Sequence, residues 1–128
     1  MRIERSTIGL TLAELVVTIF VLSLTLVGTL MFFANARLAE QSAKDMTMST
    51  SHAEFILEEM RTRTTLANIT STNWVSWAAG QGLSTLPSES VSAVYTNSAS
   101  DPLEITVTIN WIRNLRNATY SILTRMTK

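Results

Sequence analysis

The feature that most constrains this chain is an apolar run close to its N-terminus. The run from Leu10 to Phe33 is twenty-four residues long and carries a single charge, that of Glu14. As an α-helix it would rise about 36 Å, enough to cross a hydrocarbon layer of about 30 Å. A carboxylate in hydrocarbon costs several kcal/mol, so a membrane segment retains one where a cation awaits it. The sequence therefore predicts a membrane-spanning helix in which Glu14 needs a positively charged partner.

The residues around the start of this run form a recognisable signal. A short leader ends in a small residue, a large apolar residue follows, and a glutamate comes four residues later; these are Gly9, Leu10, Thr11, Leu12 and Glu14, behind Arg2 and Arg5. They resemble the cleavage and assembly signal of type IV pilins and pseudopilins. The resemblance implies that a prepilin peptidase cuts between Gly9 and Leu10 and that Leu10 becomes N-methylated. It also implies an assembly site of Glu14, Leu10 and Thr11, in which the new α-amino group of Leu10 is the cation for Glu14.

Two other interpretations of this region stay open. Glu14 could be a structural accident or an internal ion-pathway group. The run could also be an ordinary secretory signal cut near Ala34-Asn35-Ala36, although the apolar region of such a signal covers only about 7 to 15 residues. The leader, residues 1–9, has two arginines against one glutamate and no apolar region of its own. The positive-inside rule then places it in the cytoplasm and everything after Phe33 outside, with the run in the inner membrane.

The segment from Ala34 to Arg63 has the periodicity of an amphipathic helix. Apolar or small residues recur every three or four positions, at Leu38, Ser42, Met46, Ser49, Ala53, Ile56 and Met60. We therefore expect one long helix from Leu10 to Thr62, far longer than an average soluble helix. Its weak point is the stretch 47–51, where poor helix formers precede Ser51-x-x-Glu54, a pattern that could cap a second helix.

The C-terminal residues predict a small β-sheet. The clearest strand pattern is an alternation of apolar with polar residues over Leu103–Trp111. A shorter strand is expected over Val91–Thr96, and a less regular alternation over Tyr120–Met126 follows a turn at 113–117. The Ser- and Thr-rich stretch between helix and strands predicts a loop with one helical turn, anchored on the core by two tryptophans, Trp74 and Trp77.

These elements together predict an α+β fold. Three consecutive strands suggest an antiparallel meander whose apolar face is covered by the helix from Leu38 to Met60. The pilin resemblance implies the same architecture, and the C-terminal part resembles small minor pilins and I-type minor pseudopilins. The expected divisions are a leader at 1–9, a membrane helix at 10–33, its amphipathic continuation at 34–63 and a head at 64–128.

Composition argues against several classes of function. The net charge is zero, which gives no electrostatic reason to bind nucleic acid, and Arg113 and Arg116 are expected in a solvated loop. The single histidine, His52, has no second ligand at a metal-binding spacing and is expected as a solvated helix residue. With no cysteine and no catalytic motif, we expect no catalytic residue, no metal and no cofactor. The absent disulfide also disfavours a major pilin.

Two hypotheses of function remain. The first is a filament subunit, whose partners would be the prepilin peptidase, other pilin or pseudopilin subunits, an inner-membrane assembly platform and membrane lipid. The second is a bitopic inner-membrane protein whose extracytoplasmic head binds a ligand or a partner without polymerising. Processing at Leu10 would separate them, because only the first requires it.

Overall fold

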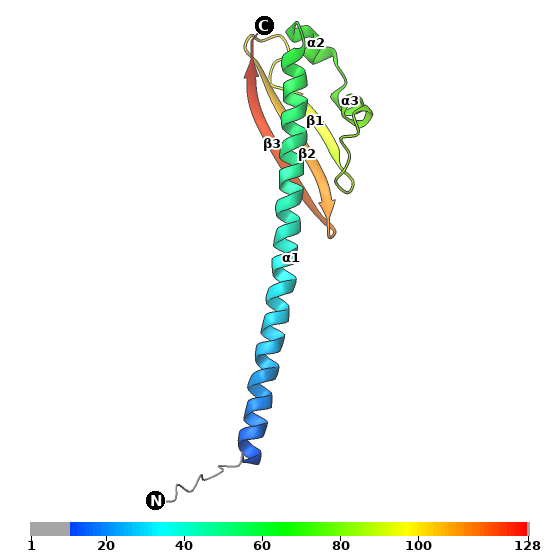
Figure 1. Cartoon of the computed structure of the whole chain (residues 1–128). Helices are drawn as coiled ribbons and strands as arrows, with labels where there is room; N and C mark the ends of the chain where they lie inside the picture. The colour runs from blue at the N-terminus through cyan, green and yellow to red at the C-terminus, as the bar shows by residue number, and fades with distance from the viewer. Residues whose placement is uncertain (1–10, 128) are drawn as a thin grey trace, which may run out of the picture. The chain divides into compact units, whose positions relative to one another are not determined.

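The computed structural model describes residues 11–127 and gives the chain an α+β fold. Helix α1 runs from Leu12 to Thr62, and a three-stranded antiparallel sheet follows it in the sequence. The predicted fold class is confirmed. The chain divides into two compact units, residues 1–41 and 42–128, and the second unit holds the sheet together with the part of α1 that packs on it (Figure 1).

Helix α1 is continuous through its stretch of serine and threonine residues, 47–51. The hydroxyls of Ser49 and Thr50 both donate to the carbonyl of Met46, at 2.9 Å. Bonds of this kind to the preceding turn satisfy hydroxyl groups inside a helix. The predicted continuous helix is confirmed, and Ser51 does not begin a second one.

The sheet is a meander of β1 (Ser90–Tyr95), β2 (Leu103–Arg113) and β3 (Arg116–Met126). The strands are hydrogen-bonded in the order β1-β2-β3, and both neighbouring pairs are antiparallel. The three predicted strands are confirmed. Strand β3 begins at Arg116, ahead of the alternation that predicted it from Tyr120.

The early start of β3 follows from the shape of the hairpin that precedes it. Asn114 and Leu115 have φ angles of 51° and 61°, the left-handed values that a two-residue hairpin loop needs at both central positions. Arg113 and Arg116 pair directly across this turn. The turn is thus tighter than the predicted 113–117, because two left-handed residues reverse the chain without additional length.

The core lies between α1 and one face of the sheet. Every second residue of β2 from Leu103 to Trp111 is buried, and Trp111 is 4% exposed. Figure 1 shows the last part of α1 lying across the sheet, and its buried apolar residues are Ala53, Ile56, Leu57 and Met60. The predicted cover is therefore correct for this part of the helix only. Leu38 and Met46 are exposed, and the first buried residue on α1 is Asp45.

Two short helices, α2 (Leu66–Ser71) and α3 (Trp74–Gly80), replace the predicted loop with one helical turn. Each begins at a polar residue whose side chain accepts a backbone N–H, a local signal for a helix start. The indole N–H of Trp74 donates to a carbonyl of α2 at 2.9 Å, and Trp77 stacks on Phe55 of α1 at 5.7 Å between ring centroids. The predicted anchoring by the two tryptophans is confirmed.

Arg113 is not in a solvated loop, as the sequence suggested, but forms an ion pair with α1. Its Nε and Nη2 donate to the two oxygens of Asp45 at 2.8 and 2.7 Å. Asp45 is 4% exposed, so its charge depends on this partner. The hydrogen bond to Asp45 raises the pKa of Arg113. The pair ties the end of β2 to the helix.

His52 is also not a solvated residue. Its Nδ1 lies 2.6 Å from Oε1 of Glu89, whose side chain is 0% exposed. Glu89 is in the segment before β1, and its Oε2 accepts the backbone N–H of Leu86 at 2.9 Å. The carboxylate therefore links α1 to the loop that leads into the sheet. No hydrogen bond joins His52 to Glu54, Glu58 or Glu59 in the part of the chain that the structure describes.

Candidate assembly site

Helix α1 begins with reciprocal hydrogen bonds between Thr11 and Glu14. The Thr11 hydroxyl accepts the Glu14 backbone N–H at 3.2 Å, and Oε2 of Glu14 accepts the Thr11 backbone N–H at 3.1 Å. The same Oε2 accepts the Thr11 hydroxyl at 3.2 Å. This arrangement is a capping box, in which two residues satisfy each other's free N–H groups at a helix start. Two of the three predicted assembly residues are therefore in contact.

One oxygen of Glu14 is left open by this cap. Both bonds from Thr11 go to Oε2, and no donor within residues 11–127 reaches Oε1. Glu14 is exposed and lies in the first turn of α1, where the helix dipole favours a negative charge. The carboxylate can therefore receive a cation at Oε1 without releasing Thr11.

The remaining predicted site residues, Gly9 and Leu10, lie outside the described residues. Cleavage between them, methylation of Leu10 and pairing of its amino group with Glu14 stay predictions. The cap itself was missed by the sequence reasoning, although Thr11-x-x-Glu14 carries the same local signal as Ser51-x-x-Glu54.

The first unit of the chain presents an apolar helix surface. All side chains from Thr11 to Lys44 are exposed in the isolated chain. The hydroxyls within the apolar run donate to carbonyls of the same helix at 2.7 to 2.9 Å, namely those of Thr18, Ser23, Thr25 and Thr29. Among the residues described, α1 is the one helix long and apolar enough to cross a membrane, a test that an N-terminal signal sequence also passes. This surface needs a cover of lipid or of other apolar helices.

Over residues 11–127 no group of three or more His, Cys, Asp or Glu side chains is placed to hold a metal ion. The pair formed by His52 and Glu89 is almost closed to solvent, with side chains 12% and 0% exposed. This pair links α1 to the segment before β1.

The chain thus joins a long apolar N-terminal helix to a small three-stranded antiparallel sheet. The architecture is pilin-like. Comparison with models of protein families, with curated proteins and with solved structures gave no match. The pilin-like character of the chain therefore rests on its architecture and on the residues around Glu14.

Proposed function

We propose that this chain is a structural subunit, a minor pilin or pseudopilin, of a type IV pilus, a type II secretion pseudopilus or a related filament. The observation that supports this most is Oε1 of Glu14, which no donor within residues 11–127 reaches, at the start of an exposed apolar helix. In this proposal the prepilin peptidase cuts between Gly9 and Leu10, and the new N-terminus lies one residue from Thr11. The helix then packs against those of other subunits.

The charge of Glu14 sets the register of that packing. An ammonium and a carboxylate about 4 Å apart attract by about 4 kcal/mol at an effective dielectric of 20, which is comparable with the cost of keeping a carboxylate in hydrocarbon. Oε2 is occupied by Thr11, so the amino group of Leu10, from the same or a neighbouring subunit, binds at Oε1. A subunit in the wrong register leaves Glu14 uncompensated and is disfavoured.

Before assembly the protein would reside in the inner membrane, with its N-terminus in the cytoplasm and its head outside. Its other partners would be the inner-membrane assembly platform and membrane lipid. We assign it a structural role and no catalytic one, since two buried carboxylates are used in ion pairs that join parts of the fold: Asp45 with Arg113 and Glu89 with His52.

Mass spectrometry of the membrane-extracted protein from its native host tests this function. We expect a mature chain that begins at Leu10 and carries N-methylation. Gly9→Val should block the cut, because a peptidase of this kind needs a small residue before it, and the uncut chain should accumulate in the membrane.

Ile8→Val is the matched control, since it changes the leader next to the cut and should be processed normally. A Gly9→Val chain of mature size, or a wild-type chain that retains its leader, would contradict the proposal. The second outcome would favour the bitopic protein with a binding head.

A further inference from the structure

The tip of the β2–β3 hairpin carries an apolar side chain that the chain itself does not cover. Leu115 is 99% exposed, the highest value among the large apolar residues described. It also has a φ of 61°, a conformation that a leucine adopts at a cost and that glycine would adopt freely. A residue that adopts this φ at lower cost, such as glycine, would therefore stabilise the turn better than leucine does. The leucine at this position suits a contact outside its own head.

The base of the hairpin that carries this side chain is attached to α1. Arg113 and Arg116 lie opposite each other in the backbone register of the hairpin, and the side chain of Arg113 donates to both oxygens of Asp45. Arg116 is exposed and has no ion pair within the part of the chain that the structure describes. The tip thus presents an apolar side chain followed by an unpaired cation.

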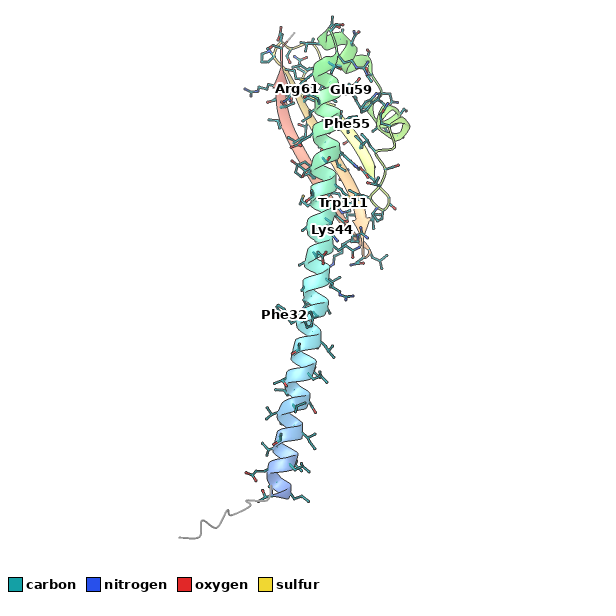
Figure 2. All side chains as sticks on the ribbon, viewed as in Figure 1. Phe32, Lys44, Phe55, Glu59, Arg61 and Trp111 are labelled. Atoms are coloured by element: carbon teal, nitrogen blue, oxygen red, sulfur yellow. The ribbon has the colours of Figure 1, made fainter. Side chains whose placement is uncertain are left out.

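A groove with negatively charged residues lies between α1 and β3. It is open, has a volume of about 550 Å³, and its lining includes Phe55, Leu57 and Ile122 as apolar groups and Glu54, Glu58 and Arg61 as charged ones. Figure 2 shows Phe55 and Arg61 on the part of α1 that crosses the sheet. Arg61 bonds to Glu58 at 3.2 Å, whereas Glu54 has no ion pair among residues 11–127. The groove therefore combines apolar and charged groups, and its two glutamates against one arginine give it an excess negative charge.

We propose that Leu115 of one copy of this chain inserts into this groove of the next copy, with Arg116 beside Glu54 and Glu58. The two surfaces are complementary, because each offers an apolar group and their charges are opposite in sign. This inference deepens the proposed function and rests on it in one respect, that the second copy is a neighbouring filament subunit. The groove and the tip are different patches of one head, so the contact is heterologous and can repeat from copy to copy.

The positions of the two patches along α1 also set a displacement between copies. The tip is attached at the level of Asp45, whereas the groove is lined from Ser51 to Arg61 on the same helix. The midpoint of that stretch lies eleven positions after Asp45, which is about 16 Å along a helix axis. Copies with parallel helices would therefore be displaced by about this distance along the axis.

Cysteine cross-linking of the full-length protein in the membranes of its host tests this contact. The chain has no cysteine of its own, so each introduced thiol is unique. Leu115→Cys in a copy with one affinity tag and Glu54→Cys in a copy with another should form a covalent dimer under mild oxidation. The matched control replaces Leu115→Cys with Leu123→Cys, which alters an exposed leucine on β3 (61% exposed) away from the tip.

We expect the pair 115 and 54 to give at least about tenfold more dimer than the pair 123 and 54. Arg116→Glu should lower the yield about two- to fivefold, the usual range for one exposed charge pair, and Glu58→Lys in the other copy should restore it. Equal yields for the two cysteine pairs would overturn the proposal. A second result would also overturn it. If the thiol of Leu115→Cys does not react with a water-soluble maleimide and forms no dimer, the bilayer covers it and the tip contacts lipid.

The failure of this inference can be told apart from the failure of the proposed function. If Leu115→Asp is cut at Leu10 and enters sheared filaments as well as Leu123→Asp does, the docking is wrong and the filament role stands. If the wild-type chain is never cut at Leu10, the filament role fails, and the cross-linking yields still decide whether two heads dock in this way.

Discussion

Asp45 and Arg113 are joined by two hydrogen bonds of 2.7 and 2.8 Å, although they are 68 positions apart in the sequence. Asp45 is the first buried residue of α1, and Arg113 ends β2 just before the hairpin. This pair therefore fixes where the helix and the sheet begin to run together.

Removing the guanidinium should leave Asp45 buried without a partner. We expect Arg113→Met to lower the melting temperature of the full-length protein in detergent by about 5 to 10 °C, because an uncompensated buried charge is costly in a domain of this size. The double variant Asp45→Met with Arg113→Met should recover most of the loss. An equal loss in the double variant would show that the pair contributes through packing alone.

Trp111 is the largest side chain of the β2 series in the core. Trp111→Ala should destabilise the head by about 3 to 5 kcal/mol, the range for removing a large buried aromatic. Chemical denaturation in detergent would measure it. Ile112→Ala is the control, because Ile112 is exposed on the other face of the same strand, and it should cost less than about 1 kcal/mol. Similar losses for both would place Trp111 outside the core.

Glu89 holds both His52 and the backbone of Leu86 from a fully buried position. Glu89→Ala should cost about 2 to 4 kcal/mol in the same measurement, since two bonds to a charged group are lost. Glu89→Gln retains one acceptor oxygen and should cost roughly half as much. If Gln is as damaging as Ala, the charge of Glu89 is what matters to His52.

Glu104, on the solvent face of β2, provides a test by pH. The hydrogen bond from Thr96, and after it the contact with Arg125, lowers the pKa of Glu104 below its usual value. A lowered folded-state pKa adds stability above the pKa of the unfolded chain, about 4.3, and this stability is lost as the pH falls through the folded value. In an NMR titration, Thr96→Val should move the pKa of Glu104 upward. An unchanged pKa would show that Thr96 is not its main partner.

Glu14 can be tested for its two roles separately. Glu14→Ala removes the cap and the charge, whereas Glu14→Gln retains an oxygen for the cap and removes the charge alone. If the ion pair sets the register, both variants should be cut normally and should enter sheared filaments at least about tenfold less than the wild type, since each 1.4 kcal/mol is a factor of ten. Wild-type incorporation of the Gln variant would mean that the cap suffices and that no ammonium binds Glu14.

Patterns that repeat within one element were enough to predict most of the fold. The alternation in β2 identified its buried face because every second residue from Leu103 to Trp111 is buried in the core. The pairing of His52 with Glu89 could not be predicted in this way, since their separation of 37 positions is set by how the loop before β1 folds back on the helix. The same holds for Asp45 and Arg113.

The candidate assembly site shows a different limit of prediction from local sequence patterns. Thr11-x-x-Glu14 and Ser51-x-x-Glu54 are the same pattern, but only the first caps a helix. The N–H groups after Ser51 are already bonded to the preceding turn, so a hydroxyl there has nothing to cap. The same pattern caps α1 at Thr11, because α1 begins at Leu12, directly after that residue.

The hydroxyl groups of the apolar run have one more consequence. Thr18, Ser23, Thr25 and Thr29 each donate their only hydrogen to a carbonyl of their own helix. Between Leu12 and Phe33, α1 therefore has no side-chain donor left with which to lock onto a neighbour. A neighbouring helix can therefore be held along this stretch only by packing and by the one charged residue in it, Glu14.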